Sequence, residues 1–568
     1  MIQAVAFSQM SIMKQKVGSL PQFGFCLLAI VSSVACALAR PAIAAPPRRL
    51  TEFSAPSGED DLDETWLAPA GDRLIFHFDG SYGLWVSDGT SEGTTLLKDL
   101  PVPWNPTAVG NRLFFHADLR QQDGGLPPSV DLWMSDGTPE GTAPIVAIVP
   151  GTSGVWHFER ISLGDRLFFA AFDPEHGEEL WSSDGTAAGT LLLQDISPGS
   201  PSSDPTNLTV LGDRLFFQAT ELEHGSELWV SDGTTEGTKL LKDIVPGSDP
   251  SYPSQLTAVG DRLFFTAYDP EHGWGLWVSD GTAVGTALAK SINAAGLTAV
   301  GDRVFFTTGD EGSGLWVSDG TPQGTAELLS DILLWKNGQP PFTLVAFSDR
   351  LFFKAYTAGH GDELWVSDGT TQGSALFKDI VPGTDSSTPY ALAAVGTKLF
   401  FTAYDSEHGH ELWESDGTEA GTMLLADLVP GANGSGPEDF TEVGRQLFFT
   451  AGGPGGPQLW VLDLKGEPLP RFHRGDSNLS GNIDISDGIA IFGHLFLGDP
   501  PVLSCKESAD ANNDGKIDIS DGIYLLQWLF TGGPAPVAPG PTGMPCGLDP
   551  DPAGSQGDLG CDSYGHCP

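Results

Sequence analysis

The sequence predicts an all-β protein built as a large β-propeller and followed by a small α-helical, EF-hand-like domain. A phrase of Leu-Trp, mostly continued by Val-Ser-Asp-Gly-Thr, returns nine times. Its tryptophans are 48, 48, 48, 48, 39, 49, 48 and 47 residues apart, a period typical of propellers or solenoids. Two twelve-residue loops of the calcium-binding type follow the last repeat. The repeated tryptophans are Trp85, Trp133, Trp181, Trp229, Trp277, Trp316, Trp365, Trp413 and Trp460.

Residues 1–44 have the features of a secretory signal peptide. An apolar run from Phe23 to Ala39 follows two lysines and precedes two small-residue cleavage motifs, at 37–39 and 42–44. A retained membrane anchor is the alternative, because the run is near the lower length limit for a spanning helix. We therefore expect a mature chain without a membrane span that is secreted, extracellular or held at the cell surface.

The charge balance limits the classes of binding partner, and the cysteines indicate the compartment in which the protein folds. The 28 basic and 74 acidic residues give a net charge of −46, which repels a phosphate backbone and argues against nucleic acid as a partner. After the signal segment four cysteines remain, Cys505, Cys546, Cys561 and Cys567. An even number clustered in an exported segment predicts two disulfides, with three possible pairings left open.

Each repeat reads as four short strands. Runs such as Leu263-Phe264-Phe265 are apolar on consecutive residues, which predicts a sheet covered on both faces. Four strands in a unit of this length favour a propeller blade over a solenoid rung. In one unit the strands are expected at 256–259, 262–267, 276–278 and 286–290, with tight turns at 260–261 and 280–281.

The ninth unit has no fourth strand before the chain turns at 465–467. The N-terminal segment 45–64, around Leu50 to Phe53, could supply that strand and close the ring. We expect one ring of eight or nine blades over residues 65–463, with two smaller propellers as the alternative.

The phrase Glu227-Leu228-Trp229-Val230-Ser231-Asp232-Gly233-Thr234 resembles the ELWxxDGT repeat family of secreted bacterial proteins. The resemblance covers roughly residues 65–463 and implies an extracellular repeat module, without an agreed chemistry. Glu414 and Leu462 depart from the usual Val and Ser of the phrase.

The polar residues of the repeat are expected to be structural. Asp and Gly suit a tight turn, and neighbouring hydroxyls can bond the local backbone. A histidine also recurs between the second and third strands, on the face that carries the connections between units, and a turn role is expected for it as well. If functional, these residues predict many weak, equivalent contacts: His176, His224, His272, His360 and His408.

A catalytic site needs an asymmetric set of side chains. We would therefore expect one where a unit departs from the repeated sequence. Residues 156–160, which include His157 and Glu159, replace an apolar strand, although surface drift is the expected explanation of such deviations. The sequence has no Gly-x-Ser-x-Gly elbow, no His-Glu-x-x-His pair and no phosphate-binding loop. One further position, after the Phe-Phe pair, also varies: His77, His116, Ala170, Gln218, Thr266, Thr307, Lys354, Thr402 and Thr450.

The two loops near the C-terminus predict a pair of calcium ions. Ca²⁺ takes six to eight oxygens, and such a loop offers them from positions 1, 3, 5, 7, 9 and 12, with Gly at position 6 for the bend. Position 7 contributes a backbone carbonyl, here from Asn482 and Lys516. The side-chain ligands are expected to be Asp476, Asn478, Ser480, Asp484 and Asp487 in the first loop and Asp510, Asn512, Asp514, Asp518 and Asp521 in the second.

Asp at position 12 and one helix after each loop, at 488–497 and 522–530, resemble a type I dockerin. The resemblance implies docking onto a cohesin-like or cell-surface protein. The loops start 34 residues apart, at Asp476 and Asp510, wider than in most dockerins, because a segment with Cys505 is inserted. We expect a linker at 464–472, a calcium domain at 473–533 and a cysteine-containing tail at 534–568.

Together these patterns predict a secreted or cell-surface, non-catalytic, calcium-binding repeat protein. Its propeller would bind carbohydrate or protein, and its C-terminal domain would tether it to a surface or a multiprotein scaffold. The alternative is a secreted polysaccharide-degrading hydrolase or lyase that carries a dockerin.

Overall fold

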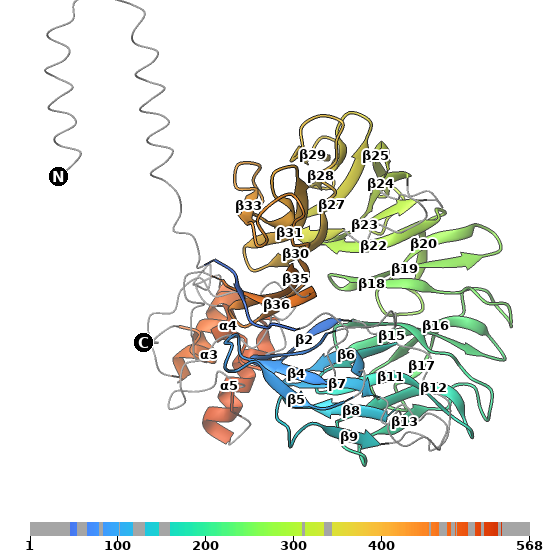
Figure 1. The fold of residues 1–568 in the computed structure, drawn as a ribbon. Coiled ribbons are helices and arrows are strands. Elements are labelled where there is room, and N and C mark those ends of the chain that lie inside the picture. Colours follow the sequence, from blue (N-terminus) through green and yellow to red (C-terminus); the bar gives the residue numbers. More distant parts are fainter. Residues whose placement is uncertain are drawn as a thin grey trace, which may run out of the picture. The chain divides into compact units, whose positions relative to one another are not determined.

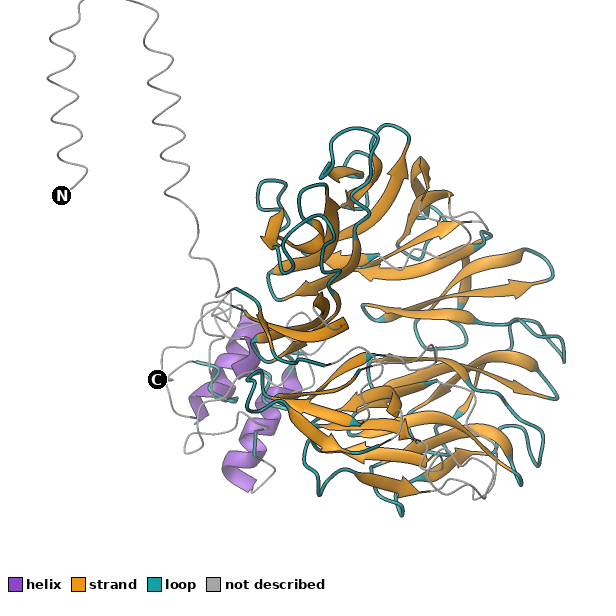
Figure 2. Cartoon of the chain, viewed as in Figure 1, coloured by secondary structure: helices purple, strands orange, loops and turns teal. Residues whose placement is uncertain are grey.

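The computed structural model describes residues 46–53, 65–78, 83–100, 103–117, 131–146, 159–308, 313–333, 344–453, 456–464, 474–478, 483, 485–497, 506–512, 516–531 and 535–536. Within these residues the β-strands form nine blades, and the first strand of each blade contacts the first strand of the next, around to the start (Figures 1 and 2). The contacting pairs include β2 with β6 and, at the closure, β34 with β2. The ring therefore has nine blades, and the alternative of two smaller propellers is wrong.

The first four blades run from the innermost to the outermost strand in chain order. Blade 1 is β2 (Trp66–Ala70), β3 (Arg73–His77), β4 (Leu84–Ser87) and β5 (Thr95–Lys98). Blade 2 is β6 (Pro103–Val109), β7 (Arg112–Ala117), β8 (Asp131–Ser135) and β9 (Ala143–Val146). Blade 3 is β10 (Arg160–Leu163), β11 (Arg166–Asp173), β12 (Gly177–Ser183) and β13 (Leu191–Gln194). Blade 4 is β14 (Thr206–Leu211), β15 (Arg214–Glu221), β16 (Gly225–Ser231) and β17 (Lys239–Lys242).

The next four blades keep this order, although a single pairing between Leu333 and Tyr356 joins blades 6 and 7 into one sheet. Blade 5 is β18 (Ser254–Val259), β19 (Arg262–Asp269), β20 (Gly273–Ser279) and β21 (Ala287–Lys290). Blade 6 is β22 (Ala294–Val300), β23 (Arg303–Thr308), β24 (Ser313–Ser318) and β25 (Ala326–Leu333). Blade 7 is β26 (Val345–Phe347), β27 (Arg350–Thr357), β28 (Gly361–Ser367) and β29 (Ala375–Lys378). Blade 8 is β30 (Tyr390–Val395), β31 (Lys398–Asp405), β32 (Gly409–Ser415) and β33 (Met423–Ala426).

Blade 9 is built from both ends of the repeat region. It consists of β34 (Glu438–Val443), β35 (Gln446–Gly453), β36 (Gly456–Asp463) and the N-terminal strand β1 (Arg48–Arg49). Arg48 pairs with Val461 and Arg49 with Trp460, in antiparallel register. The expected closure by the N-terminal segment is therefore present, and its strand pairing starts two residues before the expected Leu50.

The core lies between the blades. Leu263, Phe264 and Phe265 are all fully buried, which confirms that each sheet is covered on both faces. Phe265 packs with residues of blade 4, whereas Phe264 packs with residues of blade 6. Because successive side chains of a strand point to opposite faces, consecutive apolar residues bind each blade to both of its neighbours.

The described C-terminal helices are α3 (Ile485–Phe492), the π-helix η1 (Gly493–Leu497), α4 (Lys506–Ala509) and α5 (Ile519–Thr531). Ile483, Ile491 and Leu525 are buried in their shared core. Helices α3 and α5 begin three residues before the positions expected from the sequence. In α5 the reason is an N-cap, because Asp518 Oδ1 accepts a bond of 2.7 Å from the Ser520 peptide.

The predicted signal peptide and all four remaining cysteines lie outside the described residues. Among the helices that the structure does describe, none has the length and apolarity needed to cross a membrane.

Candidate functional site

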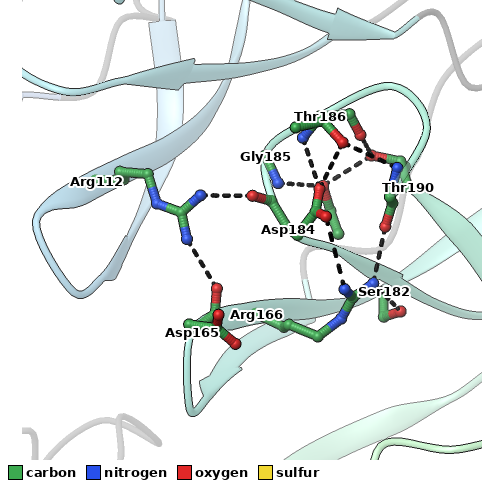
Figure 3. Close-up of polar contacts among 10 residues, drawn as sticks. Arg112, Asp165, Arg166, Ser182, Asp184, Gly185, Thr186 and Thr190 are labelled. Atoms are coloured by element: carbon green, nitrogen blue, oxygen red, sulfur yellow. Dashed lines mark hydrogen bonds and ion pairs between the residues drawn. The ribbon is translucent and has the colours of Figure 1, made fainter. Parts of the chain in front are cut away.

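The Ser-Asp-Gly-Thr phrase forms a closed hydrogen-bonded turn between the third and fourth strands (Figure 3). In blade 3, Asp184 Oδ1 accepts bonds from the Thr186 peptide at 2.9 Å and the Thr186 hydroxyl at 2.7 Å. These bonds hold the pKa of Asp184 below its usual value. The Ser183 and Thr190 hydroxyls meet at 2.8 Å beneath the turn. Because the same bonds recur in seven other blades, the predicted structural role of this phrase is confirmed.

An arginine at the start of most second strands bonds the turn of the following blade. In Figure 3 the Arg112 guanidinium donates to the carbonyl oxygens of Asp184, at 2.5 Å, and Asp165, at 2.8 Å. Arg166 instead bonds Gly189 within its own blade. The same kind of link joins Arg73 to Gly137, Arg214 to Gly281, Arg262 to Asp319, Arg303 to Asp368 and Arg350 to Gly417.

The glutamate that precedes Leu-Trp in four blades holds the connection to the next blade. Glu227 is fully buried and accepts bonds from the peptide groups of Ile244 and Ser251, and from the Ser251 hydroxyl at 2.6 Å. Desolvation raises the pKa of Glu227 to about 7, and these bonds offset it only in part. This role was not expected from the sequence. The sequence pattern that indicates it is a serine 24 residues after each glutamate: Glu179 and Ser203, Glu227 and Ser251, Glu363 and Ser387, and Glu411 and Ser435.

Each recurring histidine is paired with a carboxylate near its own loop. His176 Nδ1 lies 2.7 Å from Asp173, which also accepts bonds from the peptides of Glu175 and His176. This hydrogen bond raises the pKa of His176. His224, His272 and His408 pair in the same way with Glu221, Asp269 and Asp405, and His360 pairs with Asp379. The expected turn role is confirmed, and the described structure does not bring these histidines together.

The variable position after the Phe-Phe pair is not a surface position, so surface drift does not explain why its residue differs between blades. His77, His116 and Thr402 are almost fully buried there. The ring of His77 lies beside Trp66, with a centroid distance of 6.4 Å, and its Nδ1 lies 3.0 Å from the Gly83 carbonyl oxygen. The variation therefore reflects the packing inside each blade.

The deviant segment before blade 3 is described only from Glu159 onward, and His157 lies outside the described residues. Glu159 Oε2 accepts a bond of 3.4 Å from the Leu208 peptide, and Arg160 donates to the Asn105 carbonyl at 2.7 Å. Burial lowers the pKa of Arg160 to about 10. Both side chains thus link blade 3 to its neighbours.

A hollow of about 410 Å³ lies along the innermost strands β30 and β34. Its lining residues are Tyr390, Ala391, Leu392, Ala393, Glu438, Asp439 and Phe440. Desolvation raises the pKa of Glu438 and of Asp439 above their usual values. Asp439 also accepts a bond of 2.8 Å from the Thr450 hydroxyl. These two acids were not expected from the sequence. They could have been recognised there, because β34 is the one innermost strand that begins with two adjacent carboxylates.

The described part of the predicted calcium loops is consistent with cation binding. Asp476 and Asp487, at positions 1 and 12 of the first loop, are fully buried, as are Asp510 and Asp521 in the second. In both loops the position-12 carboxylate accepts a bond from the position-3 peptide, at 3.1 Å for Asn478. The same bond is 3.4 Å long in the second loop, from Asn512 to Asp521.

The structure describes only some of the other predicted ligands of the two loops. Ser480, Asn482, Asp484 and Asp514 lie outside the described residues, whereas Lys516 and Asp518 are described. Asp518 bonds the peptide of Ser520, which lowers its pKa. Within the described positions no three His, Cys, Asp or Glu side chains are arranged to hold a metal ion. Paired hard oxygen donors still fit Ca²⁺ in kind.

The two helices that follow these loops expose matching apolar side chains. Ile485, near the end of the first loop, and Ile489 and Phe496, after it, have exposed fractions of 50%, 62% and 65%. Ile519, Ile523 and Phe530 occupy the same positions relative to the second loop, at 51%, 44% and 65%. The exposed set is thus duplicated together with the loops.

No family model matches the chain, and neither does any curated protein. Among solved structures it is similar to puromycin hydrolase, with 15% identity over 66% of this chain and 62% of that chain, at a TM-score of 0.33. A puromycin-hydrolyzing peptidase of Mycobacterium tuberculosis matches with 14% identity over 65% and 60%, at 0.32. The β-propeller domain of the Trilobed protease from Pyrococcus furiosus matches with 10% identity over 57% and 95%, at 0.30. The chain thus spans about three fifths of the first two proteins, and its own fold rests on the strand pairing described above.

Proposed function

We propose that this protein is a secreted or cell-surface, non-catalytic scaffold. Its propeller would bind carbohydrate or protein, and its C-terminal domain would bind two calcium ions and tether the chain to a cohesin-like or cell-surface partner. The observation that carries the proposal is the duplicated set of exposed apolar side chains on α3, η1 and α5. Exposed apolar patches on an otherwise polar surface mark interaction sites.

The bonds made by the repeated polar residues of the ring support a scaffold role. The turn aspartates, the buried glutamates and the loop histidines are all engaged in bonds within or between blades. A catalytic site needs groups that converge on a reacting atom, and these residues are instead repeated in separate blades. Such a surface suits several equivalent, weak contacts with an extended ligand.

The tether is tested by surface plasmon resonance of the mature chain over immobilised type I cohesins, in millimolar calcium and in EGTA. We expect binding that EGTA abolishes and that the double variant Ile489→Asp, Ile523→Asp removes. Leu222→Asp is the matched control, because Leu222 is 84% exposed but lies on the ring. Absence of binding to every cohesin in calcium would refute cohesin docking.

A second candidate function is polysaccharide cleavage, which the hollow between β30 and β34 favours. A raised carboxyl pKa is the property of a general acid, and desolvation raises the pKa of both Glu438 and Asp439. New reducing ends from a polysaccharide panel would be measured with the wild type, Glu438→Gln and Asp439→Asn. Glu407→Gln, at an exposed loop position, is the control. Activity lost only in the first two variants would replace the scaffold proposal with an enzyme.

A further inference from the structure

Blade 5 departs from most other blades where the chain leaves its outermost strand, although the connection after blade 1, at residues 99–102, is also short. The step from Trp277 to Trp316 is 39 residues, the one short step in the repeat. The connection from blade 4 to blade 5 spans residues 243–253, whereas the connection from blade 5 to blade 6 spans only residues 291–293. The missing residues belong to the connection, because blades 5 and 6 keep all four strands.

In a regular blade this connection covers the start of the third strand. Ser226 of β16 accepts bonds from the peptides of Ser251 and Tyr252, at 3.1 and 3.2 Å, and is only 4% exposed. The buried carboxylate of Glu227 fixes the same connection. Blade 5 has Gly275 at the position of this glutamate. It therefore lacks both the carboxylate that fixes the connection and most of the connection itself.

The residue of blade 5 that corresponds to Ser226 is Trp274, and it is 42% exposed. Trp274 pairs across the hairpin with Tyr268, which is 38% exposed; their ring centroids are 6.0 Å apart and their planes meet at 63°, so each ring faces a different direction. The Tyr268 peptide donates to the Ser251 carbonyl at 2.8 Å, which brings the chain next to Tyr252, itself 51% exposed. Phe172 of blade 3 is the one other Phe, Tyr or Trp more than a third exposed in the described ring. Three exposed aromatic residues therefore belong to one blade, on the paired strands β19 and β20, which Figure 1 shows, and on the chain before β18.

The packing of blade 5 gives no reason for these rings to be exposed. An exposed tryptophan keeps a large apolar area in water, and burial of such area is worth roughly 25 cal/mol per Å². The free energy is recovered when a flat apolar surface covers the ring. The faces of pyranose rings offer such a surface through their axial C–H groups, and their equatorial hydroxyls can bond polar neighbours. His272, whose side chain is 45% exposed and whose Nδ1 lies 3.0 Å from the buried Asp269, provides such a neighbour in the adjacent loop.

Charge decides which polysaccharides fit. The chain carries a net charge of −46, and Glu271 adds an exposed carboxylate to the same loop. Uronic and sulfated polysaccharides are repelled by such a surface. The ligand class that remains is a polysaccharide without charge.

We propose that Trp274, Tyr268 and Tyr252 form a binding site for neutral polysaccharide, in which successive sugar rings stack on the exposed aromatic faces. The site deepens the proposed scaffold function and rests on its carbohydrate-binding part. Blade 5 then exchanges a structural connection for a ligand surface.

The test is affinity electrophoresis of the full mature chain, in millimolar calcium, through gels that contain hydroxyethylcellulose, xyloglucan, galactomannan or alginate. We expect at least one neutral polysaccharide to retard the protein and alginate to leave it unaffected. Trp274→Ala should weaken binding about tenfold or more, as for other tryptophan anchors. Trp274→Phe should retain part of the affinity because it keeps an aromatic face.

Phe172→Ala is the matched control, because Phe172 holds the position of Tyr268 on blade 3 and is equally exposed, at 39%. Thermal melting of each variant separates loss of the site from loss of the fold. Retardation that Trp274→Ala leaves unchanged would overturn the site and spare the scaffold proposal. No retardation by any of the three neutral polysaccharides would overturn the site and the carbohydrate-binding part, and the cohesin measurement would still decide the tether.

Discussion

Thr51 and Gln458 are hydrogen-bonded inside the protein although 407 residues separate them: the Thr51 hydroxyl donates to Gln458 Oε1 over 3.1 Å. The Gln458 amide also binds Phe53 twice, accepting from its peptide N–H at 2.8 Å and donating to its carbonyl at 2.9 Å. Four other blades have glutamate at this position, where it holds the connection to the next blade. In the last blade the side chain holds the N-terminus instead, and an amide suits a partner that offers both a donor and an acceptor.

Replacement of Gln458 by glutamate should therefore destabilise the ring. A carboxylate cannot donate to the Phe53 carbonyl, and Gln458 is fully buried, so the expected loss is about 1–3 kcal/mol of unfolding free energy. Urea denaturation followed by tryptophan fluorescence measures it. Gln323→Glu makes the same charge change at an exposed position. Equal midpoints for the two variants would contradict the role of Gln458 in closure.

The N-terminal strand also provides the link between blades 9 and 1. Arg48 donates to the Gly89 carbonyl at 2.5 Å and to Asp463 at 2.8 Å, which makes it the counterpart of the arginines that join other blades. Arg48→Ala should cost about 1 kcal/mol. Arg49→Ala is the control, since Arg49 bonds only Glu52 of its own segment among the described side chains. A thermal midpoint that falls more for Arg49→Ala than for Arg48→Ala would rule out this link.

The buried glutamates predict how stability depends on pH. Burial raises the pKa of Glu179 and Glu227 to about 7, whereas an unfolded chain ionises them near 4.5. Between these values the folded state binds more protons, so the contribution of these groups to stability is fully present below pH 4.5 and is lost as pH rises toward 7, by up to ~3 kcal/mol for each group. Histidines with raised pKa, such as His176, change stability in the same direction.

Glu227→Gln should remove its part of that slope, because an amide does not titrate. Chemical denaturation at several pH values between 4.5 and 7.5 measures the slope for each variant. Glu236→Gln, an exposed glutamate in the same unit, should leave the slope unchanged. A wild-type stability that rises across this window would show that the glutamates are ionised throughout.

The two calcium loops should differ in affinity. Ser480 in the first loop lacks the charge of Asp514 in the second, so the first loop is expected to bind more weakly, within the 10⁻⁴ to 10⁻³ M range of extracellular sites. Calorimetric titration of Asp484→Ala should lose the weaker transition and keep the stronger one. Loss of the stronger transition instead would reverse this order.

The sequence by itself determined the repeat, the four strands in each unit and the structural use of the turn residues. These properties are local, because strand periodicity, turn chemistry and spacing act over a few residues and are copied in every unit. The aspartate of each turn bonds a threonine only two residues away, so its role could be inferred from one repeat. The same holds for the histidines, which bond a carboxylate three residues earlier in four of the blades.

Only the tertiary structure decided the number of blades, the function of the glutamates and the exposure of Trp274. Each depends on contacts between segments that are far apart in the chain, as when Gln458 meets Thr51 or Glu227 holds Ser251. A ring closes at the count that its side chains can pack, and that count is a property of all the blade interfaces together. Whether an aromatic ring is buried or exposed likewise depends on which segment covers it, and no spacing within one unit records that.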